Sequence, residues 1–190
     1  MKTFYLKQKV FSFTDKYKVY DEKQNVVYHC EGRLLSFSHR MDLFETATNK
    51  PLFTIKRQVF SFLPVYHLST PDGREVATVR KRFTLLKQKL DIDSSFGQYT
   101  IEGDFFAHDF TIASETANVV EFRKKWLSWG DSYEIVVHAE QNVEFFVALV
   151  VMIDDCLHDN EGKSGSGIHI GGSLRSIHCK IPGIQCAGAL

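Results

Sequence analysis

Three runs of adjacent basic side chains are the strongest candidates for a binding site in this sequence. Ammonium and guanidinium groups attract phosphates and carboxylates, and near a charged membrane each contributes about 1 kcal/mol. If the strands that carry them are arranged equivalently around one sheet, the runs meet at one rim and form a site for anionic headgroups. Because alternation sends adjacent side chains to opposite faces of a strand, ordinary solvation of the sheet surface is the alternative interpretation. The runs are Lys56-Arg57, Arg80-Lys81-Arg82 and Arg123-Lys124-Lys125.

A second group of polar side chains, in the segment DDCLHD at positions 154–159, follows the most apolar stretch of the chain. In a helix, Asp154 and His158 share one face at a spacing of four residues, which offers an oxygen and a nitrogen ligand to a metal ion. A metal ion needs more ligands than one such pair. We therefore predict a solvated segment at the mouth of the fold, where Asp154 can hydrogen-bond to strand ends, with no metal site and no cofactor. Asp154 and His158 stay as minor metal-ligand candidates.

No motif in the sequence supports catalysis. The eight histidines are scattered, none stands in an HExxH pattern, and none lies beside a serine or cysteine in a nucleophile motif. The sequence also lacks a P-loop, a GxGxxG pattern and the paired cysteines of a zinc site, so we expect reduced thiols. We predict a protein that is not an enzyme.

The elements that must position these side chains are β-strands for most of the chain. Before residue 140 the sequence is a succession of short alternating segments rich in β-branched and aromatic residues, separated by turn residues, which is typical of an all-β sandwich or barrel. About twelve such segments can be counted, and a 4-fold repeat of strand, polar turn and strand indicates hairpins built alike. The segments span 4–11, 16–20, 26–32, 42–46, 52–60, 64–70, 75–83, 88–93, 98–103, 109–114, 118–125 and 132–139.

One turn can be predicted in detail, at Thr70-Pro71-Asp72-Gly73. Proline fixes φ for the first central position of a turn, and glycine accepts the positive φ that the exit of a bulged hairpin requires. We expect a hairpin between residues 64 and 83.

The segment VEFFVALVVMIDDCLHD at positions 143–159 predicts a buried helix. Its apolar part, Phe145 to Ile153, is about half as long as a membrane span, and a helix that is apolar on every side must be buried on every side. A closed sheet of many strands has no free edge but has a wide apolar interior that must be filled. We therefore predict a mainly β fold, a closed antiparallel barrel of about twelve strands around a central hydrophobic C-terminal helix.

Composition sets the remaining limits. The 190 residues carry 23 basic and 23 acidic side chains, so the net formal charge of zero gives no general attraction to nucleic acid, and no RNA-binding module is visible. The N-terminus lacks the features of a secretory signal, and no apolar run is long enough to span a membrane. We expect a cytoplasmic monomer, with peripheral association at the membrane as the alternative.

The domain organisation expected from the sequence is one barrel followed by an extension. Residues 1–161 form the barrel, including its central helix at 143–159, and residues 162–190 begin with the Gly/Ser signature of a linker. The segment 162–190 is interpreted as a flexible tail, a docking peptide or an extension added artificially to the chain.

Two segments together resemble the LURP-one-related family. They are VVEFRKKWLSWGDSYEIVV (119–137), whose most specific parts are Trp126, Trp129-Gly130-Asp131 and Tyr133, and the apolar helix that closes on Asp154. The resemblance covers residues 1 to about 160 and implies the tubby C-terminal fold, shared with phospholipid scramblases, and for most members no known activity. Tubby proteins bind phosphoinositides through basic residues, but no motif here allows those residues to be carried over one by one.

Two binding functions follow as hypotheses. The first is a non-enzymatic scaffold that acts through protein interaction. The alternative is binding of anionic phospholipid or phosphoinositide at the membrane surface through the three basic runs.

Overall fold

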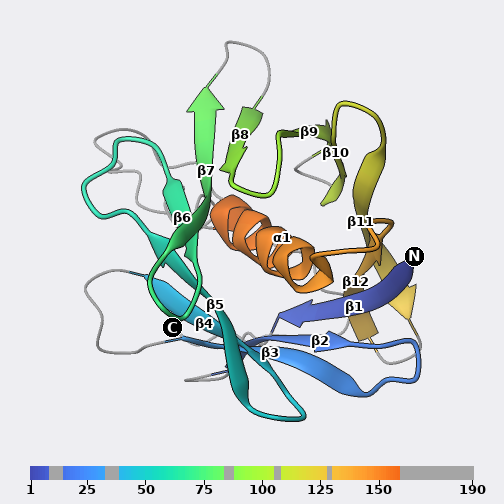
Figure 1. The fold of residues 1–190 in the computed structure, drawn as a ribbon. Coiled ribbons are helices and arrows are strands. Elements are labelled where there is room, and N and C mark those ends of the chain that lie inside the picture. Colours follow the sequence, from blue (N-terminus) through green and yellow to red (C-terminus); the bar gives the residue numbers. More distant parts are fainter. Residues whose placement is uncertain (9–14, 33–38, 84–87, 105–107, 128–129, 159–190) are drawn as a thin grey trace, which may run out of the picture.

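The computed structural model describes residues 1–8, 15–32, 39–83, 88–104, 108–127 and 130–158. These residues form twelve antiparallel strands and one helix, and the strands close into a barrel (Figure 1). The predicted fold is confirmed. The strands are β1 (Lys2–Gln8), β2 (Asp15–Tyr20), β3 (Val26–Gly32), β4 (Arg40–Glu45), β5 (Lys50–Arg57), β6 (Val65–Ser69), β7 (Glu75–Phe83), β8 (Gln88–Ser94), β9 (Tyr99–Asp104), β10 (Asp109–Ala113), β11 (Asn118–Leu127) and β12 (Gly130–Val137).

The barrel is a meander in which each strand pairs with its neighbours in sequence, and β1 pairs with β12 to close it. Because neighbouring strands are antiparallel, all odd-numbered strands end at one rim and all even-numbered strands end at the other. We call the first rim the loop rim and the second the hairpin rim. Short turns at 21–25, 46–49, 70–74, 95–98 and 114–117 join the strands at the hairpin rim.

The predicted turn between β6 and β7 is confirmed. Gly73 has a φ of 90°, and its N–H donates to the carbonyl of Thr70 at 2.9 Å, while the N–H of Thr70 donates to the carbonyl of Arg74 at 2.9 Å. An added Cβ at Gly73 would meet no atom within 4 Å, so the backbone conformation is what requires glycine at this position.

Helix α1 (Val143–His158) fills the barrel and runs from the hairpin rim to the loop rim (Figure 1). The apolar side chains from Phe145 to Ile153 are buried on every side, as predicted. At its start, the ring of Phe145 packs between Phe53 of β5 and Phe96, with centroids 6.4 and 4.5 Å away. Burial of a large apolar side chain contributes about 1.5 to 3 kcal/mol, so the helix is the centre of the core.

One strand differs clearly from its prediction. The segment 52–60 was expected as a continuous strand, but β5 ends at Arg57 and Phe60 adopts a φ of 65°, outside the extended region. Residues 58–64 form an irregular loop at the loop rim. The extension 162–190 lies outside the described residues, so its three interpretations stay predictions.

Candidate functional site

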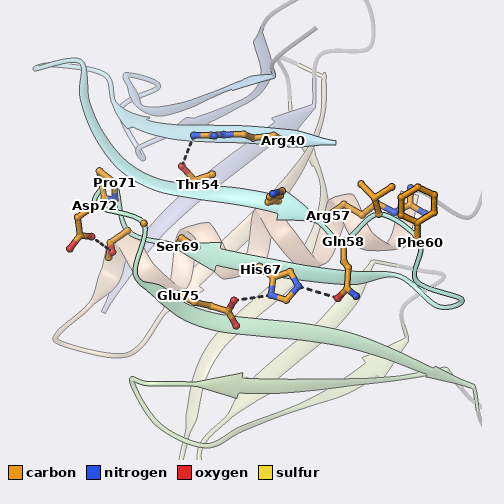
Figure 2. A pocket seen from close by; sticks show the side chains of 14 residues that line it. Arg40, Thr54, Arg57, Gln58, Phe60, His67, Ser69, Pro71, Asp72 and Glu75 are labelled. Atoms are coloured by element: carbon orange, nitrogen blue, oxygen red, sulfur yellow. Dashed lines mark hydrogen bonds and ion pairs between the residues drawn. The ribbon is translucent and has the colours of Figure 1, made fainter. Parts of the chain in front are cut away.

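A broad groove crosses the outer face of β4, β5, β6 and β7 (Figure 2). It encloses about 1070 Å³ and follows the strands from the hairpin rim, at Pro71 and Asp72, to the loop rim, at Phe60. The residues that line it are Arg40, Thr54, Lys56, Arg57, Gln58, Val59, Phe60, His67, Ser69, Thr70, Pro71, Asp72, Gly73 and Glu75.

The floor of the groove is a chain of polar contacts. His67 contacts Glu75 through Nδ1 at 3.0 Å and Gln58 through Nε2 at 3.3 Å (Figure 2). Thr78 donates its hydroxyl to the second carboxylate oxygen of Glu75 at 2.6 Å. These contacts fix side chains of β6, β7 and the residue after β5 relative to one another. The groove lining is basic at the loop rim, at Lys56 and Arg57, and acidic at the hairpin rim, at Asp72 and Glu75.

The β5–β6 loop, residues 58–64, closes the cationic end of the groove. The N–H of Gln58 donates to the carbonyl of Val65 at 2.8 Å, and the carbonyl of Pro64 accepts from the N–H of Lys81 at 3.1 Å. On the other side, the N–H of Arg57 donates to the carbonyl of His39 at 2.9 Å. The base of the loop is therefore attached to β6, to β7 and to His39, the residue before β4.

The tip of the same loop is apolar and open to solvent. Phe60 and Phe62 are fully exposed, and Val59 is 43% exposed. Sequence reasoning missed these residues, because the alternation from residue 52 to 60 fits a strand. The signal that could have found them is the stretch VFSFL, which has no charge and lies between Arg57 and Pro64.

Two of the three basic runs lie near this loop. Lys56 and Arg57 end β5, and Arg80 is exposed on β7, two strands away, where it pairs in register with Val65 next to the loop. Lys81 points into the barrel instead and is 3% exposed, as alternation along the strand requires. The side chain of Arg82 lies outside the described part of the structure.

The third run lies on β11, which is six strands from β5 in a ring of twelve and therefore on the opposite side. Arg123 pairs with Glu121, and Lys125 lies 3.3 Å from Glu134. Lys124 is exposed. All three runs are near the loop rim, but the structure does not bring them into one patch.

The interior beneath the loop rim contains two buried carboxylates at the end of α1. Asp154 is fully buried and lies 3.3 Å from Nδ1 of His108, while Asp155 is 7% exposed and lies 2.7 Å from Nε2 of His39. The prediction of a solvated segment is therefore wrong for Asp154 and Asp155. The two histidines, His39 and His108, directly precede β4 and β10.

Burial shifts the pKa of two other side chains in the barrel interior, Tyr17 and Lys81. Burial raises the pKa of the Tyr17 phenol well above its usual value, and the negative charges of Asp154 and Asp155 raise it further. Burial also lowers the pKa of Lys81, against a smaller opposing effect of Cys156. The space under the loop rim thus contains groups whose ionisation is controlled by low solvent access.

The metal-ligand candidates have different positions. Asp154 faces His108, whereas the side chain of His158 lies beyond the described atoms, although its backbone belongs to α1. Among the described residues, no group of three or more His, Cys, Asp or Glu side chains could hold a metal ion. Within the same residues, Cys30 and Cys156 are buried and are not joined in a disulfide, and no helix has the length and apolar character needed to cross a membrane.

Comparisons with known proteins agree with the fold. The family model described as LURP-one-related matches residues 2–154. The chain is similar to the uncharacterized protein YxjI of Bacillus subtilis (strain 168), with 31% identity over 160 residues that cover 84% of this chain and 96% of the relative. It also shares its fold with a protein of Arabidopsis thaliana solved by X-ray crystallography, with a TM-score of 0.57 and 15% identity over 81% of this chain and 91% of that one.

Proposed function

The chain belongs to the LURP-one-related family, and we propose that it is a non-enzymatic binding protein that docks on anionic membrane surfaces. The observation that carries the proposal is the position of three basic residues at the base of one uncharged loop. Lys56 and Arg57 end β5 where the loop begins, and Arg80 of β7 pairs in register with Val65, which follows the loop.

The local charge favours an anionic surface within a neutral protein. Arg80 lies 4.0 Å from Asp93, and both side chains are exposed, so solvent screens this pair. Three basic residues therefore lie next to a loop that carries no charged side chain of its own. Each basic residue near an anionic leaflet contributes about 1 kcal/mol, and this attraction decreases within a Debye length.

Sedimentation with vesicles tests the proposal. Wild-type protein should sediment with phosphatidylserine vesicles at low salt and not with phosphatidylcholine vesicles, and the bound fraction should decrease as salt is raised, because the Debye length falls from about 10 Å at 0.1 M to about 3 Å at 1 M. Lys56→Ala combined with Arg57→Ala should weaken binding. The matched control is Lys23→Ala with Lys50→Ala, which removes two exposed charges at the hairpin rim and should leave binding unchanged.

The second candidate is the protein-interaction scaffold, and the groove favours it. Its cationic end at Lys56 and its acidic end at Asp72 and Glu75 suit a partner segment with opposite charges at its two ends. Because each strand that forms the groove is paired on both sides, such a segment would be recognised by side chains and not by strand addition. Failure of the wild-type protein to bind anionic vesicles at low salt would reject the membrane proposal and leave this candidate.

A further inference from the structure

We propose that Phe60 and Phe62 form an aromatic wedge that inserts into the acyl boundary of an anionic bilayer. This inference rests on the proposed membrane function and assigns the depth and the contact residues of the bound state. It concerns a segment that the basic runs do not include.

Exposure distinguishes these two rings from the other aromatic rings that the structure describes. Among the side chains that the structure describes, Phe60 and Phe62 are the aromatic rings with an exposed surface, whereas the others are buried or half-buried. A soluble domain gains free energy by covering such rings, so their combined exposure at one tip marks a contact surface.

The backbone holds the rings outward. Phe60 has a φ of 65°, a left-handed conformation that bulky side chains rarely adopt. The three backbone hydrogen bonds at the base of the loop keep its ends fixed on His39, β6 and β7. Figure 2 places the Phe60 ring beyond Arg57 and Gln58, at the end of the groove. A loop fixed in this way loses little conformational entropy on insertion.

Charge complementarity identifies a bilayer as the occupant. Residues 58–64 contain no charged side chain, while Lys56, Arg57 and Arg80 surround the base of the loop. This order places apolar groups at the tip and cations behind them, at the level that phosphate headgroups occupy when rings reach the acyl boundary. The long Lys and Arg side chains can direct their charges to the headgroups while their stems cover apolar surface.

Removal of the rings tests the wedge. Phe60→Ser combined with Phe62→Ser should weaken binding to phosphatidylserine vesicles by about tenfold or more, because two buried phenyl groups return to water. The salt dependence of the remaining binding should be unchanged. The matched control, Phe60→Leu with Phe62→Leu, keeps apolar side chains at both positions and should retain most of the affinity. Equal binding by the serine variant and the wild type would overturn the wedge.

A fluorescent reporter measures insertion directly. Phe60→Trp should be quenched by brominated acyl chains in phosphatidylserine vesicles, whereas Ala47→Trp, in an exposed turn at the hairpin rim, should not. The wild-type protein gives the background fluorescence and quenching of the two natural tryptophans, Trp126 and Trp129.

The outcomes separate the two proposals. Absence of wild-type binding to anionic vesicles rejects the membrane function and the wedge together. Salt-sensitive wild-type binding without quenching of the Phe60→Trp reporter rejects the wedge alone and leaves an electrostatic contact. Quenching of Phe60→Trp, together with the loss in the serine variant, supports both.

Discussion

The two rims of the barrel both connect neighbouring strands, but they do so with different kinds of side chains. At the hairpin rim, short turns are satisfied locally, as where Ser114 accepts hydrogen bonds from the N–H groups of Thr116 and Ala117. At the loop rim, buried carboxylates pair with histidines distant in sequence, a lysine is buried, and two phenylalanines are exposed. Features that reduce stability therefore gather at one rim, which is the pattern expected where a scaffold carries a binding surface.

The largest difference in stability between the rims is expected when the partner of a buried carboxylate is removed. His108→Ala should reduce the free energy of unfolding by about 3 kcal/mol, because it removes the imidazole that lies 3.3 Å from the buried carboxylate of Asp154. Ser114→Ala at the hairpin rim should cost only about 1 kcal/mol. Urea unfolding of both variants measures the difference, and equal losses would mean that the two rims do not differ in this way.

The buried phenol of Tyr28, near the hairpin rim, allows a comparison of stability as a function of pH. Tyr28 donates its hydroxyl to Glu144 at 3.5 Å, and burial, followed by the charge of Glu144, raises the pKa of Tyr28 from 10.0 to about 12. The folded protein therefore retains this proton after the unfolded chain has lost it, so its stabilising effect is complete below pH 10 and is lost as pH rises towards 12. The loss should reach about 2 kcal/mol at the upper end. Unfolding free energies of wild type and Tyr28→Phe across this pH range check it, since the variant should lack this part of the decline.

A smaller effect of opposite sign is expected at Lys81. Lys81→Met should raise the free energy of unfolding by about 1 kcal/mol, because the methionine retains the buried stem and removes an ammonium group that is costly to bury. Arg80→Met, the adjacent residue on the outer face, should change stability by no more than about 0.5 kcal/mol. Thermal unfolding distinguishes them, and destabilisation by Lys81→Met would show that the buried charge supports the fold.

The smallest change is expected where the exposed ring is removed. Phe60→Gly should alter the free energy of unfolding by no more than about 0.5 kcal/mol, since the ring is fully exposed and glycine tolerates its φ of 65°. Gly73→Ala, the reverse exchange at a φ of 90° at the hairpin rim, should cost about 1 kcal/mol. A strongly destabilised Phe60→Gly protein would contradict a role for this ring in binding and indicate a structural one.

The sequence predicts the hairpin rim well and the loop rim poorly, for physical reasons. Turns such as Thr70 to Gly73 and the buried run from Phe145 to Ile153 depend on local preferences and on periodicity, which the sequence displays directly. The pairs of Asp154 and Asp155 with His108 and His39 join distant segments, and no local pattern announces them.

The prediction for the β5–β6 loop was wrong for a different reason. An alternation of apolar and polar residues is compatible with a strand and also with a loop that exposes aromatic rings. The pattern from residue 52 to 60 therefore could not show that β5 ends at Arg57. The sequence showed which residues form the three basic runs, but only the strand order showed that the runs are separated around the barrel.

The seam between β1 and β12 has a consequence for how the chain folds during synthesis. Lys2 pairs with Val137 of the last strand, so the sheet cannot close until all twelve strands have been made. Contacts between such distant residues form slowly, and until then β1 and the newest strand offer unpaired backbone groups to other chains. Nascent chains that stop before β12 should therefore be prone to aggregation and should depend on chaperones, whereas the completed barrel has no edge left to protect.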